Sequence, residues 1–339
     1  MTMTIIIFEI LGVGLAILSG LICWLLKTKR MTLPFLYKYN PGYTLGVISV
    51  TNPLDINEEK VNVLVKSQFR MHPLPMFMAD PFVVKENDMY YIFYEELSAK
   101  YCHFGGADIC VLQSEDGVSW RRLGNALHEP FHLSFPNVFR WKGDWYMLPE
   151  AHFSGEMRLY KAADFPMKWG VYAILKRGVA YADPMIYEQD GIWYLWYNTY
   201  LDGDNLVLFM SDSLMGNWIE HPASPIRING DDTRPAGRMN LLDGKLVYFV
   251  QSHQYGYGTG TIAYEIDTLS KTEYRDHRLD TNPILWRNGN GWARDGMHHM
   301  SYIMEADGTY LCAVDGLHSS PASWRWDWLN LPSFNFRKK

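Results

Sequence analysis

The sequence predicts an all-β fold, a five-bladed β-propeller, and two observations lead to this prediction. The first is a sixteen-residue unit that occurs five times and resembles a β-hairpin each time. The second is a further hairpin after several units, with a Trp in its last strand, so that one repeat holds four strands. The units start at residues 80, 135, 183, 236 and 300, a spacing of roughly 50 to 65 residues that suits propeller blades.

Each unit has a turn dipeptide at its centre and β-branched, aromatic or aliphatic residues on both sides. Asp-Gly between such runs is a strong hairpin signal. The five units run from Asp80 to Glu95, Phe135 to Glu150, Asp183 to Asn198, Ala236 to Gln251 and Met300 to Asp315. Their turns are Asn87-Asp88, Lys142-Gly143, Asp190-Gly191, Asp243-Gly244 and Asp307-Gly308.

The ends of the units are polar, and their starts carry ionisable residues. The last position holds Glu95, Glu150, Asn198, Gln251 and Asp315. Because the inner strands of a propeller line one channel, residues that open the units converge at one mouth. Those residues are Asp80, Phe135-Pro136-Asn137, Asp183, Arg234, Arg238, Asp295, His298 and His299. Desolvating so many ionisable groups is costly, which favours a functional site.

The N-terminus predicts one transmembrane helix before the propeller. Ile10 to Leu26 is free of charge, and a basic flank with Lys27, Lys29 and Arg30 follows. A retained anchor fits this order better than the rival, a cleaved signal peptide. We therefore expect a membrane anchor with its basic flank at 1–30, a linker at 31–39 and the propeller at 40–335. The protein would be a single-pass membrane protein, and the basic flank favours a cytoplasmic body.

The last blade is expected to close the ring with a strand from the other end of the chain. Tyr43 to Val50 reads as a strand, and we expect it beside Ser323–Leu329. Such closure removes the exposed edges of the sheet.

Composition excludes some classes of function. Apolar residues make up 48% of the 339 residues and aromatic residues 15%, enough for a full core rich in strand-forming side chains. The formal charge is −6, so nucleic acid is not an expected partner. The 4 cysteines have no zinc-type spacing, and neither a metal nor a cofactor is predicted.

Several motifs carry a resemblance to a known family. "ADPF", "HLSFPNVF", "WYMLPE", "ADPMIY", "DSLMGNWIEHPASPI" and "RPAGR" resemble the N-terminal propeller domain of plant-type glucosamine inositolphosphorylceramide transferases. That domain is similar to the five-bladed propellers of arabinanase/xylosidase-type glycoside hydrolases. The resemblance covers nearly everything from about Met71 to Tyr274 and favours a Golgi-type lumenal location, opposite to the flanking charges. The side of the membrane stays open.

The resemblance implies roles for three acids. Asp80 matches the base of the hydrolase propellers, and Asp183 matches the aspartate that orients groups and tunes their pKa values. The hydrolases take their glutamate acid from a later blade, where this sequence has Ala236-Gly237-Arg238, so Glu150 is the nearest substitute. In the plant-type transferases a glycosyltransferase domain follows the propeller. No segment of that length follows Asp315, so a separate glycosyltransferase is an expected partner.

Two main functions follow as hypotheses. In the first, a membrane-anchored propeller acts on a glycosidic linkage of a glycan or glycolipid, by hydrolysis or transfer, with Asp80, Glu150 and Asp183 as the acid/base set. In the second, a non-catalytic module binds a glycan or glycolipid headgroup and works with a separate glycosyltransferase. A scaffold with a merely structural polar ring is a third option. The sequence leaves open whether the protein is an enzyme. The expected substrate-binding residues are Arg234, Arg238, Asn137, His132, Asp295 and His298.

Purely structural roles for the same residues are also possible interpretations of the sequence. The Asp-Pro pairs at Asp80 and Asp183 would serve as turn caps. Glu150 would form a structural ion pair with an arginine such as Arg238. Arg234 and Arg238 would neutralise the acids instead of binding an anionic part of the substrate.

Overall fold

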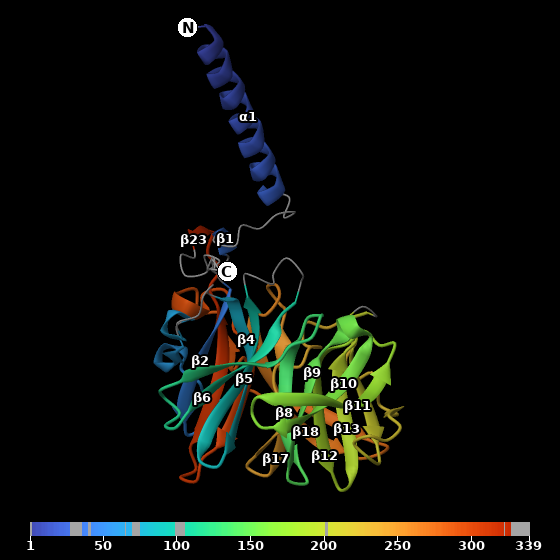
Figure 1. Cartoon of the computed structure of the whole chain (residues 1–339). Coiled ribbons are helices and arrows are strands. Elements are labelled where there is room, and N and C mark those ends of the chain that lie inside the picture. Colours follow the sequence, from blue (N-terminus) through green and yellow to red (C-terminus); the bar gives the residue numbers. More distant parts are fainter. Residues whose placement is uncertain are drawn as a thin grey trace. The chain divides into compact units, whose positions relative to one another are not determined.

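The computed structural model describes residues 2–27, 36–39, 42–64, 66–69, 75–98, 106–200, 203–321 and 323–326 (Figure 1). The chain divides into two compact units, Asn40–Pro321 and a smaller one made of Met1–Tyr39 with Ala322–Lys339. The smaller unit holds helix α1 (Thr2–Lys27) and a two-stranded sheet of β1 (Leu36–Tyr39) and β23 (Ser323–Trp326). Among the residues described, no helix is both long enough and apolar enough to pass through a bilayer. The predicted transmembrane helix is therefore not supported.

The larger unit is the predicted five-bladed propeller. Each blade is an antiparallel sheet whose strands follow one another outward from an inner strand. Blade 1 holds β4 (Pro75–Glu86), β5 (Met89–Ser98), β6 (Asp108–Ser114) and β7 (Arg121–Leu127). Blade 2 holds β8 (Ser134–Trp141), β9 (Asp144–Glu150), β10 (Glu156–Asp164) and β11 (Lys168–Arg177). Blade 3 holds β12 (Ala182–Gln189), β13 (Ile192–Asn198), β14 (Leu206–Ser211) and β15 (Ile219–Glu220).

The remaining two blades are less regular. Blade 4 holds β16 (Asn240–Leu242), β17 (Lys245–Ser252), β18 (Gly260–Leu269) and β19 (Tyr274–Arg278), and β20 (Leu285–Trp286) also pairs with β18. Blade 5 holds β21 (Met300–Met304), β22 (Tyr310–Leu317), β2 (Tyr43–Val50) and β3 (Asn62–Val63). Four short 3₁₀ helices complete the described elements: η1 (Glu58–Lys60), η2 (Lys66–Phe69), η3 (His152–Ser154) and η4 (Gly291–Ala293).

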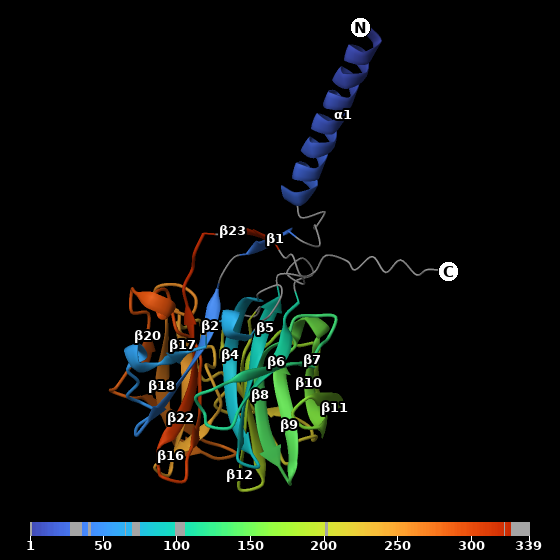
Figure 2. The ribbon, with the colours of Figure 1, turned by 60° about the vertical axis from the view of Figure 1, so that its left-hand side comes forward.

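The ring closes through a strand from the N-terminal side, as predicted, but beside a different partner. Strand β2 pairs along its whole length with β22, from Tyr43 opposite Leu317 to Val50 opposite Tyr310. In Figure 2 it runs as a blue strand next to the red strands of the last blade. The expected partner, the segment that begins at Ser323, pairs instead with β1. Strand β22 is already the second strand of its hairpin, and its free edge is where β2 binds.

Four of the five units have a two-residue hairpin turn. Central residues of a two-residue type I′ turn need positive φ, which Gly, Asn and Asp adopt most readily. The central φ angles are positive in the four turns at Asn87-Asp88, Lys142-Gly143, Asp190-Gly191 and Asp243-Gly244. In the fifth unit Met304 pairs with Tyr310, which leaves 305–309 as a longer loop. The expectation of five identical turns was wrong in blade 5.

Five apolar clusters fill the five junctions between blades. Successive side chains of a strand point to opposite faces, so each middle strand contributes to two junctions. In β5, for example, Ile92 packs toward blade 5 and Phe93 toward blade 2. Each junction is represented here by one residue from each of its two blades. These pairs are Leu311 with Ile92, Phe93 with Met147, Leu148 with Leu195, Trp196 with Tyr248, and Phe249 with Val314. The core is therefore a closed ring of inter-blade layers.

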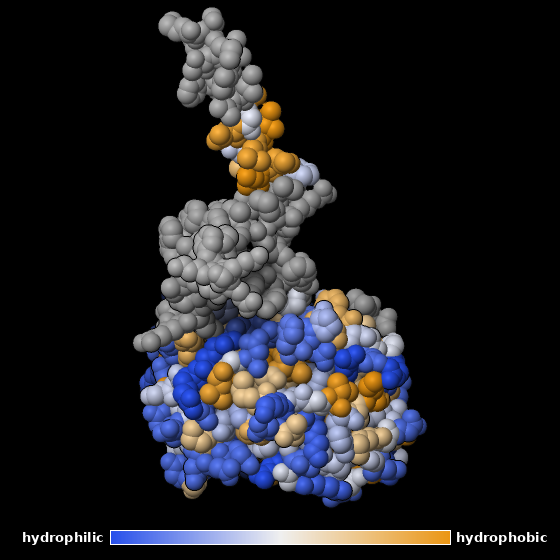
Figure 3. All heavy atoms as spheres, in the orientation of Figure 1, coloured by the Kyte–Doolittle hydropathy of each residue, from blue (hydrophilic) through white to orange (hydrophobic). Residues whose placement is uncertain are grey.

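The surface in the view of Figure 3 is mixed in polarity. Hydrophilic residues predominate on the visible face of the propeller, and apolar residues form small groups among them. Scattered apolar side chains of this kind are normal for a folded domain.

We predict that Gly237 is required for the packing of blade 4 against blade 5. Its φ is +154°, and a Cβ there would lie 2.1 Å from the carbonyl oxygen of Met300. Because that oxygen belongs to the backbone, the strand itself would have to move. Gly237→Ala should lower the free energy of unfolding by roughly 2–4 kcal/mol, as measured by urea denaturation.

Gly170→Ala is the matched control, because nothing lies within 4 Å of a Cβ at that exposed strand position. It should change stability by less than about 0.5 kcal/mol. Equal effects of the two substitutions would contradict the close packing at Gly237.

Candidate functional site

The inner strands of blades 1 to 3 each contain a residue in the left-handed conformation. Asp80, Phe135 and Asp183 have φ of 51°, 46° and 53°. Each lies at a shift in register between its strand and the next one. A left-handed non-glycine residue costs on the order of 1–3 kcal/mol, and a bulge redirects the backbone at that point. The three positions therefore need compensating contacts.

Carboxylates of the preceding blade supply those contacts. Asp315 Oδ2 accepts the backbone N–H of Asp80 at 3.1 Å, and Asp80 Oδ2 accepts that of Phe135 at 3.1 Å. Glu150 Oε2 accepts the N–H of Asp183 at 3.2 Å. The three bonds join blade 5 to 1, blade 1 to 2 and blade 2 to 3. These three acids thus have a structural role. Each binds a backbone N–H of the next blade and not one of its own turn.

Arg234 links two of the predicted catalytic acids. Its Nε lies 2.7 Å from Asp183 Oδ2, and its Nη2 lies 3.6 Å from Glu150 Oε2. Gln251 Nε2 donates a further hydrogen bond of 3.0 Å to Asp183 Oδ2. Burial raises the pKa of Asp183, Arg234 opposes this and the charge of Glu150 adds to it, and the resulting pKa is about 6. Asp183 therefore titrates close to neutral pH.

His298 lies between two further acids. Its Nδ1 is 2.8 Å from Asp315 Oδ2, and its Nε2 is 3.7 Å from Asp80 Oδ1. Burial lowers the pKa of His298, but the charges of Asp315 and Asp80 outweigh burial and raise it to about 9. Burial also raises the pKa of Asp315, yet His298 and the N–H groups beside it hold that pKa below its usual value. His298 and Asp315 thus form a buried ion pair at neutral pH.

Asp80 is the acid of the cluster that is least well satisfied. Burial raises its pKa well above the usual value; His298 opposes this, and the neighbouring carboxylates add to it. Within the described residues Asp80 Oδ1 has no hydrogen-bond donor, and His299 Nδ1 lies 3.6 Å away. Burial lowers the pKa of His299 to about 3, so this imidazole is neutral. Burial therefore disfavours the ionised form of Asp80, and the neighbouring imidazole of His299 is neutral.

His132 and Glu95 lie at the edge of the same cluster. His132 Nε2 is 3.0 Å from Glu95 Oε1. Burial lowers the pKa of His132, but Glu95, Glu150 and Asp80 together raise it to about 9. His132 is therefore a third cation, after Arg234 and His298, that is paired with an acid of the cluster.

A metal ion could in principle be held by Asp80, His298 and Asp315. One possible ligand atom from each lies within 4.8 Å of the others. However, His298 Nδ1 and Asp315 Oδ2 already contact each other at 2.8 Å, and a protonated imidazole cannot bind a metal. The observed arrangement is that of an ion pair.

Asn137 and Arg238, two further predicted site residues, donate hydrogen bonds to backbone carbonyls. Asn137 is buried, and its Nδ2 donates to the carbonyl oxygen of Pro184 at 3.2 Å. Arg238 Nη2 donates to the carbonyl oxygen of Val83 at 2.9 Å, which ties blade 4 to blade 1. Burial lowers the pKa of Arg238 to about 10.

Asp295 is the predicted residue that the structure does not bring to the cluster. Arg294 holds both of its carboxylate oxygens, at 3.0 and 2.9 Å, and the Ser319 N–H donates to it at 2.8 Å. These bonds hold the carboxylate in a partly exposed pair with its sequence neighbour.

Residues that the prediction left out of the site also belong to the cluster. Asp315, Glu95 and Gln251 were recognised as polar strand ends but not as members of the site. Their position at the ends of the second strands was the signal that could have placed them beside the strand starts. Tyr257, which the sequence offered with Tyr181 and Tyr255 as a possible surface for a sugar, has its ring centroid 5.3 Å from the Arg234 guanidinium carbon.

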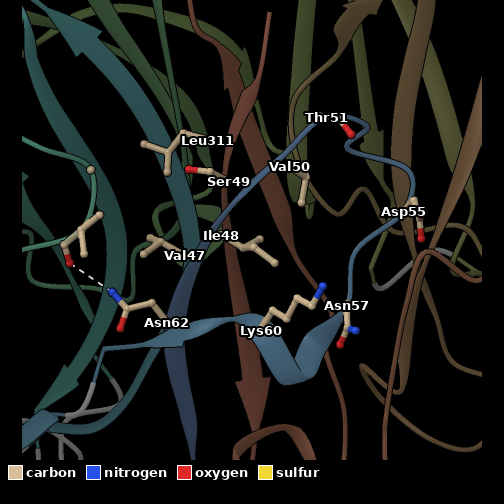
Figure 4. A pocket seen from close by; sticks show the side chains of 12 residues that line it. Val47, Ile48, Ser49, Val50, Thr51, Asp55, Asn57, Lys60, Asn62 and Leu311 are labelled. Atoms are coloured by element: carbon tan, nitrogen blue, oxygen red, sulfur yellow. Dashed lines mark hydrogen bonds between the residues drawn. The ribbon is translucent and has the colours of Figure 1, made fainter. Parts of the chain in front are cut away.

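A hollow where blade 5 meets the β6–β7 turn of blade 1 is lined by none of these acids (Figure 4). Its volume is about 600 Å³, and its lining includes Val47, Thr51, Asp55 and Lys60. Asp55 and Lys60 are the two ionisable residues of this lining. The hollow therefore lacks the converging acids of the cluster.

The fold and the cluster together define a five-bladed propeller that gathers ionisable groups from all of its blades. Solved structures share this fold. A thermostable family-43 glycoside hydrolase matches with a TM-score of 0.52 and 17% identity over 71% of this chain and 89% of its own. The catalytic domain of a family-62 α-L-arabinofuranosidase from Coprinopsis cinerea gives a TM-score of 0.52 and 12% identity over 85% and 99%.

Sequence comparison identifies the family. The profile "glucosamine inositolphosphorylceramide transferase 1, N-terminal" matches residues 62–317, and the chain belongs to this family. Glucosamine inositolphosphorylceramide transferase 1 of Arabidopsis thaliana is 33% identical over 283 residues, which are 80% of this chain and 35% of that protein. The protein of the same name from Oryza sativa subsp. japonica is 30% identical over 249 residues, 71% of this chain and 33% of its own. The chain thus spans about a third of the length of these curated relatives.

We predict that His132 makes stability depend on pH. A histidine whose pKa is raised on folding stabilises the fold fully below its unfolded pKa, and the contribution is lost as pH rises through the folded pKa. For His132 this window runs from about pH 6.5 to about 9. His132→Gln should remove up to about 3 kcal/mol at pH 6 and much less at pH 9.5, as measured by urea denaturation.

His277→Gln is the control, because His277 pairs with Asp267 where both side chains are about half exposed and water screens the charges. A loss for His132→Gln that is equal at both pH values would contradict the ion pair with Glu95.

Proposed function

We propose that the propeller binds a glycan at the acid cluster and acts on a glycosidic linkage. The observation that supports this most is that Asp80 and Asp183 lie in one cluster but in different environments. Asp80 favours the protonated form, whereas Asp183 has a pKa of about 6. Two carboxyl groups held in opposite protonation states are what glycosidic chemistry requires. The names of the relatives, which are glucosamine inositolphosphorylceramide transferases, support a sugar as the ligand.

The proposed roles follow from the contacts. Asp80 would donate the proton on Oδ1 to the departing oxygen, because its Oδ2 is held by the Phe135 N–H. Asp183, ionised above about pH 6, would accept a proton from water or from an acceptor hydroxyl. Glu150 would position this base, since it contacts both the N–H of Asp183 and Arg234. Hydrolysis and transfer both fit this arrangement.

A non-catalytic glycan-binding module is the second candidate. One observation favours it: Asp183 Oδ2 is already bound by both Arg234 and Gln251, which makes it a weaker base. In this case a separate glycosyltransferase would perform the chemistry on a sugar held by the propeller.

Turnover and binding assays on Asp80→Asn separate the two candidates. Asparagine keeps an oxygen for the Phe135 N–H but has no acidic proton. If the propeller is an enzyme, 4-nitrophenyl glycosides of glucosamine, arabinofuranose and xylose should include a substrate whose kcat falls about 10²–10⁴-fold in this variant, with binding retained. The activity of the wild type should rise with pH through about 6, as Asp183 ionises.

Asp295→Asn serves as the control and should keep full activity, because Asp295 is paired outside the cluster. Sugar binding without turnover in the wild type would contradict the enzyme and support the binding module.

Membrane attachment through the N-terminal segment stays a prediction of the sequence. Its basis is the uncharged run from Ile10 to Leu26 with its basic flank. The full chain expressed in cells should stay in the pellet after alkaline carbonate extraction, and a variant without residues 1–30 should be released. Release of the full chain would contradict an integral anchor.

A further inference from the structure

The loop between β17 and β18 presents an aromatic side chain in an unusual way. Tyr257 lies between Gly256 and Gly258, whose φ angles are +113° and +67°. The Gly256 N–H donates to the His253 carbonyl at 3.0 Å, and Thr259 Oγ1 donates to the Ser252 carbonyl at 2.9 Å. The loop is thus internally bonded, and its two glycines supply a backbone path that other residues rarely adopt.

The backbone at Gly258 lies directly against the cluster. A Cβ at this position would be 2.4 Å from Tyr43 Oη and 3.1 Å from His298 Cβ. Tyr43 in turn stacks on the His298 ring, with centroids 4.2 Å apart. Glycine therefore permits an approach that brings the Tyr257 ring beside His298.

Tyr257 contacts two cations of the cluster and still faces solvent. Its ring centroid is 5.3 Å from the Arg234 guanidinium carbon and 5.5 Å from the centre of the His298 ring. The residue is 52% exposed. Burial of its hydroxyl raises its pKa; Arg234 opposes this, and Asp183 and Asp80 add to it. The ring therefore lies beside Arg234 and His298, two partners of the acids, while about half of the residue is exposed.

The cations of the cluster are already paired. Arg234 is bound to Asp183 at 2.7 Å, His298 to Asp315 at 2.8 Å and His132 to Glu95 at 3.0 Å. Arg238, further along blade 4, donates to a backbone carbonyl. Arg238 Nε is buried and has no hydrogen-bond partner among the described residues. Of the cations named here, Arg238 alone has no acid partner, and a phosphate or carboxylate on the ligand would meet the paired acids first. A neutral sugar or one with an amino group meets no such repulsion.

We propose that Tyr257 is the platform on which a sugar ring stacks, and that this sugar is neutral or carries an amino group. The proposal rests on the function proposed above, because it concerns the same cluster. Aromatic side chains offer a large apolar surface with a polar tip, and polar groups beneath such a surface fix the orientation of a ligand. The aromatic face would hold the ring, and Asp80 and Asp183 would bind its polar groups. This ligand class differs from the anionic group that Arg234 and Arg238 are expected to bind from the sequence, which stays a prediction.

The test compares two tyrosines of the same loop. Tyr255 is 60% exposed, and it contacts Trp286 and Arg287 rather than the acids, so Tyr255→Ala is the matched control. Binding to the full chain would be measured by calorimetry with the methyl glycosides of glucosamine, glucose and glucuronic acid and with inositol monophosphate. Urea denaturation of each variant checks that it is folded.

The expected result is that the glucosamine or glucose glycoside binds at least tenfold more tightly than the two anionic probes. Tyr257→Ala should weaken this binding tenfold or more, and Tyr257→Phe should stay within threefold because it keeps the ring. Tyr255→Ala should bind as the wild type does.

Three outcomes would overturn the proposal, each in a distinct way. Equal losses for Tyr257→Ala and Tyr255→Ala, or none for either, would remove the platform while leaving the function at Asp80 intact. Preference for glucuronate or inositol phosphate would overturn the class of ligand. Binding of none of the probes by a folded wild type would contradict both the platform and the proposed function.

Discussion

The structure depends on carboxylates that accept backbone N–H groups across the junctions between blades. Asp315, Asp80 and Glu150 each bind the N–H of a residue in the next blade. In blades 1 to 3 that residue is left-handed, so its N–H leaves the ladder of its own sheet. A buried N–H without a partner would cost on the order of 1–3 kcal/mol. These acids therefore stabilise the ring of blades, whatever chemical role they also have.

This dual use explains the distribution of charge in the cluster. Buried carboxylates need compensation, and Arg234, His298 and His132 each supply it within about 3 Å of one acid. Asp80 is the exception, since among the described residues no cation comes closer to its carboxylate than His298, at 3.7 Å. Its Oδ1 keeps no donor within the described part of the chain. Asp80 is thus the acid of this cluster whose hydrogen bonding is incomplete, and such a group is a candidate for reactivity.

The cluster is also supported by contacts over long distances in sequence. Tyr43 stacks on His298 from the strand that closes the ring, and Gly258 brings its loop against both. The closing strand, the fourth blade and the fifth blade thus meet at one histidine. Changes to ring closure are expected to alter the charge cluster, because the same residues serve both.

The sequence by itself determined the elements that depend on local pattern. Alternation of side chains, turn dipeptides and repeated unit length predict the hairpins and their fivefold repetition, and the polar strand ends pointed to Glu150. Only the tertiary structure decided which charges meet. Asp295 pairs with its neighbour while Asp315 enters the cluster, Arg234 binds two acids, and β2 joins β22 instead of the segment after Ser323. Turns and strand faces are set by neighbouring residues, whereas ion pairs across a ring depend on how distant blades close on one another.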